Sequence, residues 1–160
     1  MHKFDYDEIK EFIMNSSKTT KVYMGADSTR YRKNGIWWAE YTVAIVVHID
    51  GSKGCKVFGE VTHEPDYDQK KDRPRMRLMN EVMKVCAAYH EIGPFLEDRY
   101  CEVHLDINPN KKHGSSCVID EAVGYVKGMC NITPKVKPEA FAASFCADRF
   151  TEVVHLRPAA

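Results

Sequence analysis

The pattern of hydrophobic and polar residues in the first half of the chain predicts a short helix followed by three strands. Apolar residues at positions 9, 12 and 13 follow several acids, which is typical of an amphipathic helix. Stretches rich in Val, Ile and aromatic residues then alternate with turn signals at Asn34-Gly35 and Asp50-Gly51. These predicted strands cover residues 21–27, 36–49 and 55–61. Because tight turns join them, we expect an antiparallel meander in which Asp27 ends the first strand.

Helical and strand patterns alternate in the second half. After a polar, acidic loop over 63–72, apolar residues recur at helical spacing from Pro74, which opens a helix, to Gly93-Pro94, which ends it. The later predicted elements are a strand over 100–106, a helix from Ser115 or Ser116 to about 127, a strand over 132–136 and a helix from Pro138 to about 150. The order β-β-β-α-β-α-β-α, with an extra helix in front, predicts an α/β fold with a five-stranded mixed sheet flanked by helices.

Length and composition narrow the class of protein. The 160 residues suit a single domain, with a helical extension over 1–18 and a core over about 20–151. No apolar run approaches the ~18 residues of a membrane span, and the acidic N-terminus lacks the apolar stretch of a signal peptide. We therefore expect a cytoplasmic protein with no membrane partner. The six cysteines include no C-x-x-C pair, which argues against a zinc site.

Four acids lie at positions that the predicted helices and strands could bring to one site. Asp27 and Asp106 each end a strand, and if those strands are adjacent and parallel, both carboxylates emerge at one edge of the sheet. Glu81 lies at the partly apolar border of the helix that follows Pro74. Asp148 sits in a last helix that is otherwise nearly all apolar, where a carboxylate needs a partner. We expect the four to converge.

Converging carboxylates repel one another unless cations neutralise them. Hard oxygen ligands favour Mg²⁺ or Mn²⁺. Two such ions clamp a phosphodiester, activating water on one side and stabilising the leaving oxygen on the other. The constellation therefore suits phosphodiester hydrolysis, although each acid taken singly is also explained by a local contact, such as Glu81 with Lys84 or Asp148 with Arg149.

Four segments of the chain resemble the YkuK-type family of the ribonuclease H-like superfamily. They are Val22-Tyr-Met-Gly-Ala-Asp-Ser28, Arg77-Leu-Met-Asn-Glu81, His104-Leu-Asp-Ile-Asn108 and Lys137-Pro-Glu-Ala-Phe-Ala-Ala-Ser144. The resemblance covers about 20–151 and implies a ribonuclease H-like fold. It also implies that Asp27, Glu81, Asp106 and Asp148 occupy the positions of the superfamily's metal-binding acids. The acidic loop over 63–72 and the balance of 23 Lys and Arg against 23 Asp and Glu differ from strongly basic ribonucleases H.

Two hypotheses of different classes follow. The first is a nuclease that binds two Mg²⁺ or Mn²⁺ ions and cleaves DNA, RNA or a hybrid. Its expected substrate-binding residues are Ser28, Arg77, Asn108, Lys137 and His113. The second is a non-catalytic module that keeps the fold and binds nucleic acid or protein through Arg73, Arg75 or Arg77. An exposed outer strand would allow a homodimer under either hypothesis.

A basic and aromatic segment follows the first predicted strand. Arg30, Arg32 and Lys33 flank the predicted site in chain order, where a phosphate backbone would run. Trp37 and Trp38 offer rings for stacking on bases. Aromatic residues on a sheet are more often part of the core, so we expect these two to be packed inside.

Overall fold

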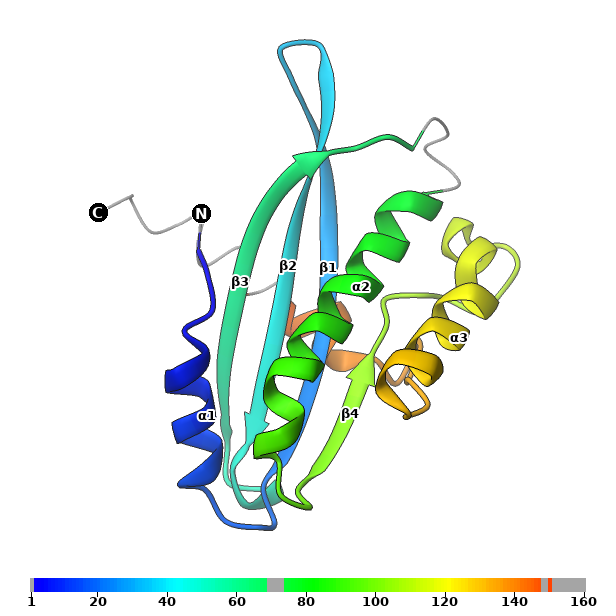
Figure 1. The fold of residues 1–160 in the computed structure, drawn as a ribbon. Coiled ribbons are helices and arrows are strands. Elements are labelled where there is room, and N and C mark those ends of the chain that lie inside the picture. The colour runs from blue at the N-terminus through cyan, green and yellow to red at the C-terminus, as the bar shows by residue number, and fades with distance from the viewer. Residues whose placement is uncertain (1, 69–73, 148–149, 151–160) are drawn as a thin grey trace.

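The computed structural model describes residues 2–68, 74–147 and 150. Its four-stranded sheet has the order β3-β2-β1-β4, with β4 parallel to β1 and the other pairs antiparallel. The strands are β1 (Lys21–Lys33), β2 (Ile36–His48), β3 (Cys55–Pro65) and β4 (Tyr100–His104). The helices are α1 (Tyr6–Met14), α2 (Arg75–Ile92) and α3 (Ile119–Cys130), with short turns η1 (Ile49–Gly51), η2 (Gly93–Phe95) and η3 (Gly114–Val118) and a π-helix, η4 (Ala142–Ala147). Figure 1 shows α2 in front of the sheet and η4 behind it.

The first strand is longer than the sequence predicts. It pairs with β2 from Lys21↔His48 to Lys33↔Ile36, and the turn at Asn34 and Gly35 has positive φ angles of 52° and 77°. Asp27 therefore lies inside β1, and the prediction that it ends a strand is wrong. The physical reason is that the Asn-Gly turn, which favours positive φ at both positions, closes a hairpin whose cross-strand pairs continue past the acid.

The prediction of five strands is also wrong, because the described residues form a sheet of only four. The segment 132–136 does run beside β4, but only as a single parallel bridge between His104 and Lys135. Lys135 N donates to Val103 O at 2.9 Å, and Leu105 N donates to Lys135 O at 2.9 Å. Pro134 and Pro138 flank this bridge, and each lacks the N–H that a longer ladder requires.

The core lies between the sheet and α2. Alternate residues of β1, namely Val22, Met24 and Ala26, are buried against one cluster that also includes Val82 and Val85 of α2. The predicted helix after Pro74 is confirmed. The predicted helix from Ser115 or Ser116 begins instead at Ile119, since the Ser115 hydroxyl accepts a hydrogen bond from Asn108 N at 3.0 Å.

The opposite face of the sheet is covered by η4, at the place where β1 has a glycine. A Cβ on Gly25 would lie within 3 Å of backbone atoms of Ala142 and Ala143. A glycine is needed here because any side chain would push η4 away from the sheet. The predicted last helix, from Pro138 to about 150, is represented among the described residues mainly by the π-helix over Ala142–Ala147. No helix among residues 2–68 and 74–147 is long and apolar enough to span a membrane.

Candidate functional site

Asp27 and Asp106 lie at the same level on neighbouring chain segments. The parallel register of β1 and β4 reaches Gly25↔His104, and two residues further along each segment are Asp27 and Asp106. Side chains alternate along extended chain, so these two acids share the η4 face with Gly25 and His104. The register therefore places the two acids on one face at this edge of the sheet, although Asp27 does not end its strand.

Asp106 is held by groups from the segment that follows α3. Lys137 Nζ forms an ion pair with Asp106 Oδ1 at 2.7 Å, and Ser144 Oγ donates to the same oxygen at 3.3 Å. The side chains of Lys137 and Asp106 are 39% and 18% exposed. The cation is thus accessible to solvent while it neutralises the acid.

Glu81 approaches from α2 and is 5% exposed. It accepts a short hydrogen bond from Ser28 Oγ, and Arg77 Nη1 donates to Ser28 Oγ at 2.9 Å and to Ser28 O at 3.0 Å. Burial raises the pKa of Glu81 well above its usual range, and repulsion from Asp27 and Asp106 adds to the rise, against the opposing effects of Ser28 and Arg77. Glu81 and Asp106 line one narrow recess between α2 and the chain after β4. Hydrogen bonds thus link Ser28, Arg77 and Glu81, and Asp27 and Asp106 lie near enough to Glu81 to contribute to the rise of its pKa.

A cavity of about 490 Å³ opens next to Asp106. Its lining comprises Asn108, Pro109, Lys137, Pro138 and Ser144. The Asn108 side chain accepts a hydrogen bond from Asn110 N at 2.9 Å and so shapes the loop as well as facing the cavity. Lys137 faces both the cavity and Asp106, which makes it the basic group best placed for a phosphate in this cavity.

One of the predicted site residues does not join this arrangement, and another lies outside the described residues. His113 is exposed in the loop before η3, and no hydrogen bond or ion pair of its side chain occurs within the described part of the chain. Asp148 lies outside the described residues, as does Arg73. Across residues 2–68, 74–147 and 150, no group of three His, Cys, Asp or Glu side chains is spaced to hold a metal ion.

Asp68 contributes to the site without having been predicted. Its carboxylate accepts hydrogen bonds from Met76 N at 2.8 Å and Arg77 N at 2.9 Å, which caps the N-terminus of α2. Arg30 holds the same loop, with its Nη2 donating to Asp68 O at 2.9 Å and its Nε 2.5 Å from Asp66 Oδ2. The acidic loop therefore fixes the turn of α2 that carries Arg77. The sequence offers no local signal, because Asp68 is eight residues from the first amide it caps.

His104 ties η4 to the sheet. It is fully buried, its Nε2 lies 2.7 Å from Glu102 Oε2, and its Nδ1 accepts a hydrogen bond from Ala142 N at 3.1 Å. Burial lowers the pKa of His104 despite the neighbouring Glu102. A neutral ring with its proton on Nε2 satisfies both contacts, so His104 is a packing histidine.

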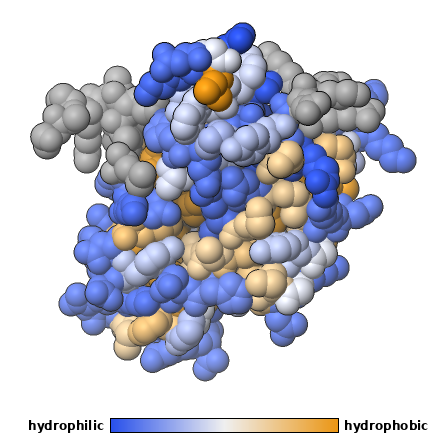
Figure 2. All heavy atoms as spheres, turned by 45° about the horizontal axis from the view of Figure 1, so that its top comes forward, coloured by the Kyte–Doolittle hydropathy of each residue, from blue (hydrophilic) through white to orange (hydrophobic). Residues whose placement is uncertain are grey.

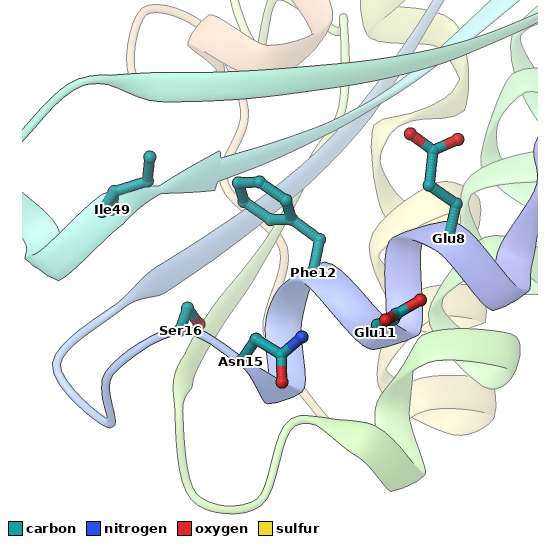
Figure 3. Close-up of a pocket in the computed structure, with 6 residues that line it drawn as sticks. All are labelled: Glu8, Glu11, Phe12, Asn15, Ser16 and Ile49. Atoms are coloured by element: carbon teal, nitrogen blue, oxygen red, sulfur yellow. The ribbon is translucent and has the colours of Figure 1, made fainter.

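A second cavity, of about 390 Å³, lies between α1 and η1. Figure 3 shows Phe12 projecting from α1 toward Ile49, with Glu8 and Glu11 at the rim. None of the predicted site residues lines it. It lies toward the end of the sheet away from the β1–β2 turn (Figure 1).

A comparison with protein families agrees with this arrangement of helices and strands. The family model described as ribonuclease H-like matches residues 6–152, which is most of the chain. No curated protein and no solved structure matches it. The mixed sheet with helices on both faces is consistent with that fold. The chain therefore belongs to the YkuK-type family of ribonuclease H-like proteins, which indicates a function related to nucleic acid.

Proposed function

We propose that this protein is a divalent-metal-dependent nuclease that hydrolyses phosphodiester bonds of nucleic acid. The observation that carries the proposal is that Glu81 and Asp106 line one recess, while Glu81 is hydrogen-bonded to Ser28, the chain neighbour of Asp27. Burial, with a contribution from the two neighbouring acids, raises the pKa of Glu81, and a buried carboxyl group with a raised pKa beside other acids is typical of a functional site. A structural acid has no need of two further carboxylates beside it.

The donor chemistry of this place fits Mg²⁺ or Mn²⁺. Carboxylate oxygens are the ligands these hard cations prefer, and Lys137 now supplies the positive charge at Asp106 that a cation would provide. Asp27, Glu81 and Asp106, with Asp148, would hold two ions. Two bound ions would supply a nucleophile from water at neutral pH and stabilise the leaving oxygen.

Other residues of the chain would orient the acids and the substrate. Ser28 and Arg77 hold Glu81 through their hydrogen bonds. Arg77 Nε is buried without a hydrogen-bond partner among the described residues, so one donor remains at the site. Lys137 and Asn108 face the cavity beside Asp106, where a phosphate of the substrate would lie. His113 would contact substrate only from the rim.

The test is a cleavage panel with a matched acid-to-amide control. Labelled single strands, duplexes, an RNA–DNA hybrid and a four-way junction are incubated with Mg²⁺, Mn²⁺ or chelator. Asp106→Asn should abolish metal-dependent cutting, whereas Asp7→Asn on the exposed side of α1 should leave it unchanged. Mn²⁺ should also raise the melting temperature of the wild type and of Asp7→Asn, but not that of Asp106→Asn.

The competing hypothesis is a non-catalytic binding module. It predicts no cutting of any substrate, together with binding that survives Asp106→Asn and weakens when Arg75 or Arg77 is replaced. That combination would overturn the nuclease. Cutting that persists in Asp106→Asn would overturn the assignment of this acid.

A further inference from the structure

The β1–β2 hairpin projects beyond the helices as an arm (Figure 1). The arm, defined here as residues 29–38, contains both tryptophans of the chain and three cations, with no acid, in a protein whose net charge is zero. At about 3.3 Å per residue, its turn lies about 20 Å from Asp27 along β1. Figure 2 shows hydrophilic residues predominating around this end of the molecule and hydrophobic patches across the middle of the face.

Trp37 is an exposed ring fixed by arginine, contrary to the expectation that it belongs to the core. It is 39% exposed, and the guanidinium of Arg30 lies 4.2 Å from its ring centroid. Arg30 is itself anchored to Asp66, and Asp66 N donates to Trp37 O at 2.9 Å. The ring is therefore held in place at the surface with part of its area open to a binding partner.

The other side of the arm also carries rings. Tyr31 and Trp38 are cross-strand partners, and Tyr31 OH lies 3.0 Å from His63 Nδ1. By alternation along β1, Tyr31 shares its face with Asp27. Trp37, the cross-strand partner of Arg32, lies on the opposite side of the arm from Tyr31, and by the same alternation that side continues to Ser28 and so toward Glu81.

The arm carries positive charge that the described residues do not neutralise. Arg32 and Lys33 are exposed, and neither forms an ion pair within the described part of the chain. Arg32 lies 5.6 Å from the Trp37 ring centroid, so a charge and a ring are presented together. This combination matches an unpaired nucleotide, which offers a phosphate and a free base face.

We propose that the arm binds a single-stranded segment of nucleic acid, with a base stacked on Trp37 and phosphates at Arg32 and Lys33. The inference rests on the proposed function, since it supplies the strand that the acids would cleave. A duplex is the poorer fit because its bases are already stacked on one another and have no face free for the ring.

The test uses the full-length protein in chelator, so that binding is measured without cleavage. Because both tryptophans lie in the arm, intrinsic fluorescence reports on it directly. A mixed-sequence single strand, of DNA or RNA, should quench the fluorescence and bind more tightly than the blunt duplex of the same sequence. Trp37→Ala should weaken single-strand binding by about tenfold or more. Trp37→Phe, which keeps a ring, should retain most of the affinity.

Charge is tested separately, with variants of exposed residues that do not disturb the fold. Arg32→Gln combined with Lys33→Gln should reduce the slope of log affinity against log salt by about 1.4, or about 0.7 for each phosphate contact with a single strand. The matched controls are Lys21→Gln and Tyr100→Ala, a cation and ring 5.8 Å apart at the other end of the sheet. They should bind like the wild type.

The outcomes separate this inference from the nuclease. If Trp37→Ala and the double charge variant bind as the wild type does, the arm is not the binding site for a single strand. That result would leave the proposed nuclease activity standing, provided that the wild type still shows metal-dependent cutting. Equal losses in Tyr100→Ala would overturn the binding inference as well. If single-strand binding depends on the arm but no substrate is cut, the binding inference is supported and the proposed nuclease activity is contradicted.

Discussion

Glu81 shows how the fold makes it less favourable for one buried carboxyl group to ionise. Its pKa is raised by burial, then by Asp27 and Asp106, so the folded state keeps its proton to higher pH than the unfolded state does. Between the two pKa values the unfolded chain has lost its proton and the folded chain has not. Stability therefore falls as pH rises above the ordinary range of a carboxyl group.

Glu81→Gln should remove this penalty. In chelator at pH 7, we expect the variant to be more stable than the wild type by at least about 1 kcal/mol, with the difference vanishing near pH 4. Urea denaturation across that range measures it. Glu64→Gln is the control, because the pKa of Glu64 is lowered. Burial alone would raise this pKa, but hydrogen bonds from Lys84 and Asn80 outweigh that effect. The control variant should gain no stability at pH 7, and an equal gain there would contradict the explanation.

At the scale of elements, α2 depends on a cap that is distant in sequence. Asp68 is 8% exposed and accepts from the amides of Met76 and Arg77. Asp68→Ala should cost about 1 kcal/mol of unfolding free energy, and Asp68→Asn, which keeps one acceptor oxygen, should recover part of it. Denaturant unfolding of the three proteins gives the comparison. Equal stability of Asp68→Ala and wild type would show that the cap is dispensable.

The contact of η4 with β1 depends on the absence of a side chain at Gly25. Gly25→Ala should destabilise the protein by about 1–3 kcal/mol, because its Cβ meets the backbone of Ala142 and Ala143. Gly124→Ala in α3 is the matched control, since a Cβ there meets nothing within 4 Å and alanine favours a helix. Thermal or urea unfolding of both variants is the measurement. If they behaved alike, close packing of η4 would not be the cause.

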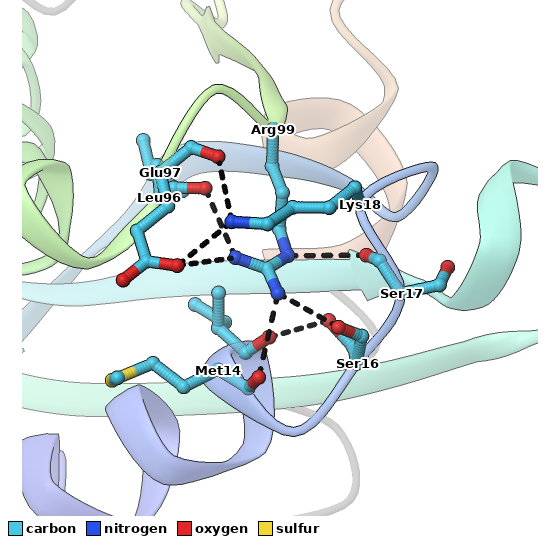
Figure 4. Close-up of polar contacts among 8 residues, drawn as sticks. Met14, Ser16, Ser17, Lys18, Leu96, Glu97 and Arg99 are labelled. Atoms are coloured by element: carbon cyan, nitrogen blue, oxygen red, sulfur yellow. Dashed lines mark hydrogen bonds and ion pairs between the residues drawn. The ribbon is translucent and has the colours of Figure 1, made fainter.

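At the scale of the whole molecule, Arg99 ties the start of β4 to the loop between α1 and β1. The side chain is buried and donates to the carbonyl oxygens of Ser17 at 3.1 Å, Leu96 at 3.1 Å and Ser16 at 2.7 Å (Figure 4). A longer contact reaches Met14 O at 3.4 Å. One guanidinium therefore satisfies backbone groups from two distant parts of the chain.

Replacing Arg99 by Met should leave those carbonyls without a donor. We expect a loss of about 2–3 kcal/mol of unfolding free energy and faster hydrogen exchange in α1. Lys18→Met is the control, because its ion pair with Glu97 is exposed, with side chains 64% and 50% exposed. That change should be nearly neutral. If hydrogen exchange in α1 is the same in the Arg99 variant and the wild type, Arg99 does not stabilise this part of the molecule.

Local patterns in the sequence account for most of the elements. Period and turn chemistry are properties of neighbouring residues, so α1, α2 and the turn at Asn34-Gly35 are predictable without a partner. The same patterns place Glu81 on a helix, and they predict that Asp106 ends a strand, whereas β4 ends two residues earlier, at His104. The resemblance of four segments to one family then predicts which acids belong together, and the family match confirms that the chain belongs to that family.

Tertiary structure decided what depends on pairing across the chain. Asp27 lies inside β1 because β2 continues the hairpin past it, and Lys135 forms only a bridge because prolines interrupt the ladder. Asp68 caps a helix from eight residues away, and Trp37 is exposed on an arm that no helix covers. The sequence by itself determined most of the elements and the types of chemical group. The register and the contacts, which depend on residues far apart in the chain, decided which groups meet and which remain at the surface.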